Sequence, residues 1–302
     1  HVALGDNTTA SNNTAVGYLA LNANTTGANN VAIGRDALLV NTTGACNVAV
    51  GVFALDANTT ACYNTGLGYG ALSVNTTGSS NTAVGFYSLL ENTTGTNSVA
   101  VGPNALRANT TGAENVAVGF DSLKANTTAQ RNTAVGVAAL CTTTTGCQNT
   151  AMGYHALRDN TGCFNSAFGE QAMVANTSGQ CNTGFGYRAL ALNTTGNAGT
   201  AVGFCSLINN TTGAYNVAVG TNALLANTTG SQNNAFGRNA LDSNTTANSN
   251  NAFGHGALGL NTTGAENTAM GDGALAANTT ANENTAVGAY SLSTNTTGAG
   301  NV

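Results

Sequence analysis

The tripeptide Asn-Thr-Thr recurs along the chain and is the first residue pattern that could carry chemistry. An asparagine followed two residues later by threonine or serine is the acceptor signal for N-linked glycans. Such a signal is present at Asn7, Asn24, Asn41, Asn58, Asn75, Asn92, Asn109, Asn126, Asn176, Asn193, Asn210, Asn227, Asn244, Asn261, Asn278 and Asn295. One interpretation is a dense row of glycans. The other is a structural ladder of Asn and Thr side chains, which form turns by bonding nearby backbone amides.

A second asparagine recurs without that signal as a rule. It stands at Asn13, Asn30 and Asn47, and each lies four residues before a glycine of the chain's repeat. The chain therefore uses asparagine structurally in any case, which tempers the glycan interpretation.

Four of the seven cysteines are candidates for disulfide bonds. Cys46 and Cys62 are 16 residues apart, and so are Cys147 and Cys163. If the chain returns to the same place every 16 or 17 residues, each pair lies on adjacent turns. Adjacent strands are about 4.8 Å apart, within the Cα separation that a disulfide needs. We therefore expect Cys46–Cys62 and Cys147–Cys163 disulfides in an oxidising compartment.

No other residues are spaced for a catalytic, cofactor or metal site. Aspartate is sporadic, His155 and His255 stand at variable positions, and no Ser/His/Asp set or paired carboxylates recur. The sequence therefore predicts a protein that is not an enzyme. Only 6% of residues are charged, and Lys and Arg are not clustered as nucleic-acid binding requires. No apolar run approaches the roughly 20 residues of a membrane span.

These residues are positioned by one 17-residue repeat, of which Asn216 to Gln232 is a copy. Its glycine recurs with fifteen spacings of 17 residues and one of 16, at Gly17, Gly34, Gly51, Gly68, Gly85, Gly102, Gly119, Gly136, Gly153, Gly169, Gly186, Gly203, Gly220, Gly237, Gly254, Gly271 and Gly288. We number positions in the repeat from this glycine, as −6 to +10. A fixed period in this range indicates a solenoid, in which each repeat is one rung.

The residues before the repeat glycine alternate in character with period two, which is typical of a strand. Position −1 is always apolar, position −3 is mostly Thr or Val, and position −2 is always Ala or Gly. Position +4 is leucine in every copy except Met173. We expect position −1 and this leucine to form a narrow core. Another part of the rung, or another chain, would then pack against position −2.

The pattern thus predicts an all-β fold, a parallel β-solenoid of about 17 stacked 17-residue rungs. Each rung would hold two short strands and two turns, and rungs about 4.8 Å apart give a length of roughly 80 Å. The 16-residue step arises at Asn160-Thr161-Gly162, where a turn is one threonine shorter. Only 12 residues separate Gly5 from Gly17, as if a first Ala-Leu segment were missing. We expect residues 1–302 to be a single continuous array and a segment of a longer fibre.

The strand half resembles a known motif. Ser98-Val99-Ala100-Val101-Gly102 and Asn30-Val31-Ala32-Ile33-Gly34 are similar to the Ser-Val-Ala-Ile-Gly repeats in the YadA-like heads of trimeric autotransporter adhesins. Similar repeats occur in phage tail fibres. The resemblance implies a left-handed parallel β-roll, three chains to a trimer, and display at a surface to bind host matrix. Here the unit is longer than in that family, because Asn-Thr-Thr-Gly is added.

The expected function is that of an extracellular structural fibre or filament segment, with or without N-linked glycans along the Asn-Thr-Thr row. An adhesin head or a phage tail-fibre shaft at a cell or virion surface is the alternative. An ice-binding protein is a third interpretation, which the adjacent threonines, such as Thr228-Thr229, disfavour. The expected partners are further copies of the chain, as a homotrimer or a head-to-tail filament. No nucleic acid, membrane span or cofactor is expected.

Overall fold

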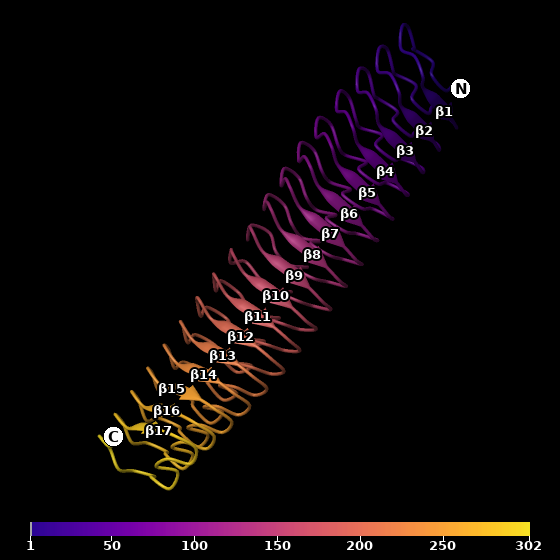
Figure 1. Ribbon diagram of the computed structural model, residues 1–302. Helices are drawn as coiled ribbons and strands as arrows, with labels where there is room; N and C mark the ends of the chain where they lie inside the picture. Colours follow the sequence, from indigo (N-terminus) through magenta and orange to yellow (C-terminus); the bar gives the residue numbers. More distant parts are fainter. Residues whose placement is uncertain (1) are drawn as a thin grey trace. The chain divides into compact units, whose positions relative to one another are not determined.

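The computed structural model describes residues 2–302 and confirms an all-β parallel solenoid, with no helix among those residues. The chain divides into two compact units, which end and begin at Gln148 and Asn149. Within each unit every rung contributes one three-residue strand to a parallel sheet (Figure 1).

The strands cover positions −3 to −1 of each rung. In the first unit they are β1 (Thr14–Val16), β2 (Val31–Ile33), β3 (Val48–Val50), β4 (Thr65–Leu67), β5 (Thr82–Val84), β6 (Val99–Val101), β7 (Val116–Val118) and β8 (Thr133–Val135). In the second unit they are β9 (Thr150–Met152), β10 (Ser166–Phe168), β11 (Thr183–Phe185), β12 (Thr200–Val202), β13 (Val217–Val219), β14 (Asn234–Phe236), β15 (Asn251–Phe253), β16 (Thr268–Met270) and β17 (Thr285–Val287).

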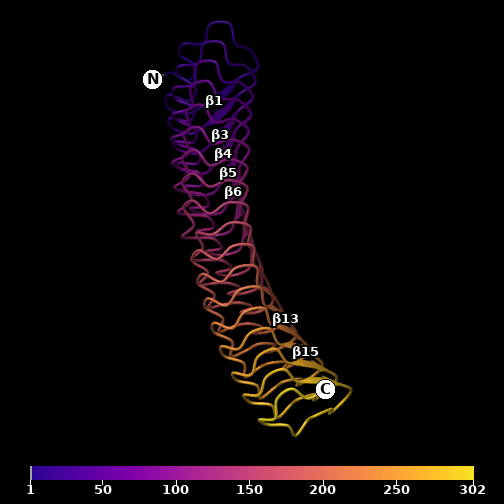
Figure 2. The same ribbon diagram turned by 90° about the vertical axis from the view of Figure 1, so that its left-hand side faces the viewer.

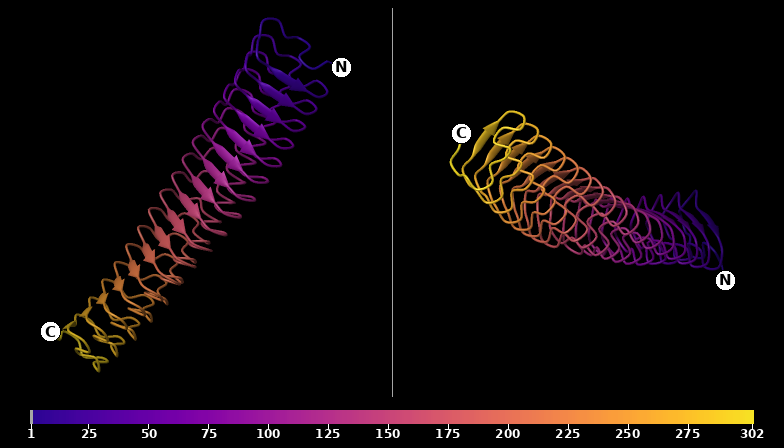
Figure 3. Two further views of the ribbon diagram at one scale, coloured as in Figure 1. Left: turned by 45° about the vertical axis from the view of Figure 1, so that its right-hand side comes forward. Right: turned by 90° about the horizontal axis from the view of Figure 1, so that it is seen from below.

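Within each unit, successive strands pair in parallel, and the register places equivalent positions side by side. Thr82 of β5 faces Val99 of β6, for example, and Ala83 faces Ala100. Figures 2 and 3 show the loops of successive rungs following one another in the same order within each unit. Every side chain at a given repeat position therefore forms a row along its unit.

The second strand predicted for each rung is absent, because the Ala-Leu half of the rung is a series of turns. Positions +2 and +4 both have left-handed backbone, with φ of 54° at Tyr87 and 48° at Leu89. This conformation breaks up a strand, yet the segment still bonds to the next rung. The N–H of Leu89 donates to the carbonyl of Ala105 at 2.9 Å.

The core of each rung is smaller than the sequence predicts and lies on the opposite side of the strand. The alanine at position −2 and the leucine at position +4 are fully buried, as Ala83 and Leu89 show. At Gly66, an added Cβ would lie 3.4 Å from Leu55 of the preceding rung and 3.1 Å from the carbonyl oxygen of Ala71. The group that packs against position −2 is therefore the turn half of the solenoid.

Position −1 faces outward, so the expectation that it belongs to the core is wrong. Val16 is 58% exposed and Phe185 is 55% exposed. The alternation identified the two faces of the strand correctly, but the buried face carries the small residues. A larger side chain does not fit between the strand and the leucine row.

The repeat glycine is required by its backbone and by the spacing of the rungs. Gly119 has a φ of 132°, and a Cβ there would lie 2.5 Å from the carbonyl oxygen of Gly136 on the next rung. L-residues rarely adopt this conformation. The glycine row thus lets the strand turn sharply into the next segment while rungs stay in contact.

The shortened rung is absorbed by its turn, as predicted. Thr150 of β9 still faces Ser166 of β10, and Asn176 Nδ2 still donates to Asn160 Oδ1, at 2.6 Å. The interpretation of the chain start was wrong. The N–H of Leu4 bonds to Ala20 as that of Leu21 bonds to Ala37, so Leu4 occupies position +4 and Gly5 is not a repeat glycine.

Candidate functional site

The asparagines of the Asn-Thr-Thr signals form a buried hydrogen-bonded ladder. Asn75 Nδ2 donates to Asn58 Oδ1 on the preceding rung at 3.0 Å and to the carbonyl of Gly78 at 2.9 Å. Its own Oδ1 accepts from Asn92 Nδ2 at 2.8 Å. Of the sixteen candidates, all but Asn7 and Asn295 are buried, and none of the buried ones is more than 2% exposed. The structural ladder, one of the two interpretations of this motif, is what the structure shows.

This geometry bears directly on glycosylation. A sugar on Nδ2 replaces one amide hydrogen and needs open space beside it. Both amide hydrogens of a ladder asparagine such as Asn75 are used, and its side chain is inaccessible to solvent. A glycan and the folded ladder therefore exclude each other at the buried positions. Asn7 is exposed and Asn295 is half-buried.

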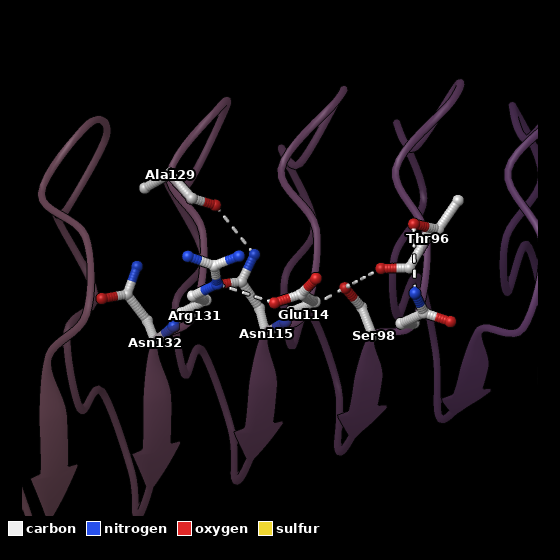
Figure 4. A network of polar contacts seen from close by, with 8 residues as sticks. Thr96, Ser98, Glu114, Asn115, Ala129, Arg131 and Asn132 are labelled. Carbon is white, nitrogen blue, oxygen red and sulfur yellow. Dashed lines mark hydrogen bonds and ion pairs between the residues drawn. The ribbon is translucent and has the colours of Figure 1, made fainter.

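The second row of asparagines, at position −4, ties each strand to the turn. Asn115 Nδ2 donates to the carbonyl of Ala129 at 2.8 Å, and its Oδ1 accepts the backbone N–H of Asn132 at 3.0 Å (Figure 4). Ser98 replaces asparagine in this row and still accepts the N–H of Asn115, at 3.3 Å. The asparagine at this position is structural, as the sequence indicates.

The two threonines of each turn have different environments. Thr76 Oγ1 donates to the carbonyl of Thr93 on the next rung at 3.1 Å, whereas Thr77 is exposed. In turns of this kind one threonine is bound to the neighbouring rung and only the other is exposed, whereas Thr177 and Ser178 of a later turn are both exposed. The adjacent threonines do not form a double row of exposed hydroxyls.

The candidate cysteines lie in the turns between the Asn-Thr-Thr-Gly segment and the strand. Cys46 and Cys62 carry free thiols in the structure, and Cys62 Sγ accepts the N–H of Ala45 at 3.3 Å. Cys147 belongs to the first unit and Cys163 to the second, and both are half-buried. Both disulfides stay predictions for an oxidising compartment.

The titratable groups are dispersed or paired on the surface. Asp272 accepts hydrogen bonds from the hydroxyl of Tyr290 at 2.9 Å and from His255 Nδ1 at 3.0 Å, and these bonds lower the pKa of the Asp272 carboxyl. Burial raises the pKa of Asp56, whose Oδ1 accepts from Ser73 Oγ at 2.6 Å. No cluster of three His, Cys, Asp or Glu side chains able to hold a metal ion occurs within residues 2–302. That stretch also contains no helix of the length and apolarity needed to cross a bilayer.

A further candidate surface is the outward face of the strands, whose position −1 the sequence pattern assigns to the core. We call the side chains at positions −3 and −1 the outward stripe. In the second unit it includes Phe236 and Phe253, whose rings stack with centroids 4.9 Å apart. Its exposed large apolar residues are Val16, Ile33, Val48, Leu67, Met152, Phe185, Phe236, Phe253, Met270 and Val287. The invariably small residue at position −2 was the signal that could have revealed this orientation.

Comparison with known proteins adds no identity to this geometry. The sequence matches no protein-family model, and no curated protein shows significant similarity to it.

Proposed function

We propose that this chain is a structural fibre segment whose copies associate side by side through the outward stripe. The observation that carries the proposal is the apolar side chain at position −1 of every rung, which in the first unit is exposed at Val16, Ile33 and Leu67 and half-buried on the other rungs. Isolated exposed apolar residues are ordinary on protein surfaces. Here the parallel register places them in a continuous row.

The size of the stripe supports an interface. Eight rungs at about 4.8 Å each, with a face about 10 Å wide, give a projected area on the order of 400 Å² for one unit. The largest apolar patch on a soluble monomer typically has an area of this order and is often functional. Charged side chains are few, since only 6% of the residues are charged. Electrostatic repulsion between identical copies is therefore weak.

The proposal includes an extracellular or surface location, which is supported by the resemblance of the strand motif to adhesin heads and tail fibres. The same resemblance suggests three chains per assembly. A glycan coat is not needed to keep the remaining surface hydrated, because exposed threonines such as Thr77 and Thr94 line the opposite turns.

The test is the mass in solution, measured by light scattering after gel filtration over a range of concentrations. We expect the native chain to form a defined oligomer. A Val101→Lys/Val118→Lys variant, altered in the stripe on β6 and β7, should be monomeric. The matched control is Thr94→Lys/Thr111→Lys, which adds the same charges at exposed turn positions. Circular dichroism would establish that both variants are folded.

A native chain that stays at 29.8 kDa at every concentration would overturn the proposal. So would a folded stripe variant that assembles as the native chain does. Either result would show that the apolar side chains of the stripe are exposed without mediating association.

A further inference from the structure

A cluster of aromatic side chains interrupts the uniform surface of the first unit. Phe53, Tyr69, Phe86 and Tyr87 follow the repeat glycine on three successive rungs. The centroid of the Tyr69 ring lies 5.8 Å from Phe53, 5.7 Å from Phe86 and 5.5 Å from Tyr87. Tyr69 and Phe86 are 42% and 50% exposed. The rings thus pack against one another and still present a broad face to solvent.

The cluster borders a hollow of about 260 Å³, which opens to solvent beside Gly70. Gly70 occupies position +2, where the neighbouring rungs carry Phe53 and Tyr87. A Cβ on Gly70 would lie 2.8 Å from the Tyr87 ring, so the missing side chain lets that ring lean over the backbone. Ser73, Leu90 and Arg107 complete the wall. Aromatic and polar groups therefore converge on one recess.

The fold itself does not call for aromatic residues at these positions. Phe53 and Tyr87 have φ of 58° and 54°, a left-handed conformation that asparagine and glycine adopt with less strain. Asn104 and Asn222 occupy the equivalent position with φ of 57° and 58°. Leu19, Ala138 and Arg188 adopt the same conformation at this position, so the scaffold accepts many side chains here and does not itself require aromatic ones.

The charges around the rings restrict the class of ligand. The guanidinium of Arg35 lies 4.6 Å from the centroid of the Phe53 ring, and that of Arg107 lies 5.4 Å from the Tyr87 ring. The two guanidinium groups disfavour a cationic ligand, and the carboxylate of Asp36, 3.3 Å from Arg35 Nε, disfavours an anionic one. They suit a neutral ligand with an apolar face for the rings and hydroxyl groups for the polar side chains. Pyranose sugars combine these two features.

We propose that this hollow is a saccharide-binding site that takes an extended polysaccharide along the stacked rungs. The ring surfaces that Arg35 and Arg107 leave uncovered would pack against C–H groups of successive sugars, and Arg107 would hydrogen-bond their hydroxyls. Adjacent rungs are about 4.8 Å apart, so an extended chain lying along the unit would pass the aromatic side chains of one rung after another. Consecutive rungs can therefore contact the same polysaccharide.

The test is electrophoresis of the whole chain in native gels cast with hydroxyethylcellulose, xylan or soluble starch. We expect at least one of these polysaccharides to retard the native chain. Tyr69→Ala/Tyr87→Ala should weaken this retention about tenfold, as removal of central aromatic contacts does at other interfaces. The matched control is Tyr187→Ala/Phe204→Ala, which removes an exposed stacked pair, with centroids 5.3 Å apart, outside the hollow. Arg107→Ala, which leaves the rings in place, should also weaken retention.

Failure of all three polysaccharides to retard the folded native chain would overturn the proposal. If the Tyr69/Tyr87 variant and the control lost retention equally, the proposal would also be overturned, because any exposed aromatic side chain would then bind the polysaccharide. If the chain captured a protein in a Tyr87-dependent manner and no polysaccharide retarded it, the ligand of the hollow would be a protein and not a saccharide. None of these outcomes depends on self-association, which the variants in the outward stripe test separately.

Discussion

At the scale of single residues, the side-chain amide of asparagine does the most to define the fold. A typical interior ladder asparagine, such as Asn75, donates twice and accepts once while fully buried. A buried amide is costly unless it is hydrogen-bonded. The turn carbonyl of Gly78 accepts from Asn75 and also from Asn64 of the position −4 row. The two rows therefore meet at the same turn and fix the path of the rung.

Breaking this ladder should destabilise the rung it belongs to. In Asn75→Asp the amide donor becomes an oxygen that faces Asn58 Oδ1 and the Gly78 carbonyl, both acceptors. We expect a local loss of at least about 2 kcal/mol, since unsatisfied buried groups cost roughly 1–3 kcal/mol each. Hydrogen exchange of the amides near residue 75 would measure it. Thr77→Ala, at an exposed position of the same turn, is the control and should change little.

The array also contains a natural break in the ladder, which provides the reciprocal test. Thr143 occupies the asparagine position, and the Oδ1 of Asn126 on the preceding rung is buried without a hydrogen-bond partner. Thr143→Asn supplies the missing donor. We expect slower hydrogen exchange around Asn126, and no change or faster exchange would show that the turn at Thr143 cannot accommodate the amide.

At the scale of the elements, the space behind each strand limits the size of the side chains on its buried face. Position −2 faces the leucine row across a gap that accepts one methyl group, as the contacts that a Cβ at Gly66 would make indicate. Gly66→Ala should therefore stabilise the first unit by about 0.4–1 kcal/mol, because it reduces the freedom of the unfolded chain. Ala83→Val should destabilise it by about 1–3 kcal/mol through overpacking. Thermal unfolding followed by circular dichroism would measure both. Equal effects of the two changes would contradict a core of this size.

The period, the strand positions and the register could be predicted from the sequence, because each depends on spacing alone. The direction in which the strand faces could not be predicted by hydrophobicity, since the buried Ala83 is less apolar than the half-exposed Val84 beside it. The left-handed backbone at Leu89 was also hidden, because leucine carries no signal for that conformation. The tripeptide at Asn75 fitted both a sugar acceptor and a ladder. Only the position of its side chain separates the two.

At the scale of the whole molecule, each unit is an array in which a rung contacts its neighbours. Such arrays have stabilities that are roughly the sum of rung and interface contributions. All rows, of glycine, leucine and asparagine, continue only if successive rungs keep equivalent positions in register. The shortened rung at Asn160 shows that the turn tolerates a change of one residue, since β9 and β10 still pair residue for residue.

This register argument predicts how the first unit responds to deletions. Removal of residues 103–119 joins Gly102 to Phe120 and eliminates one full repeat. We expect a cooperatively folded chain that resists proteolysis and is modestly less stable, because one rung interface is lost. Removal of residues 103–111 instead joins Gly102 to Gly112, which deletes Leu106 and Asn109 from their rows. Limited proteolysis should then cut near residue 102. If both deletions were equally resistant to proteolysis, the buried rows would not be what holds adjacent rungs together.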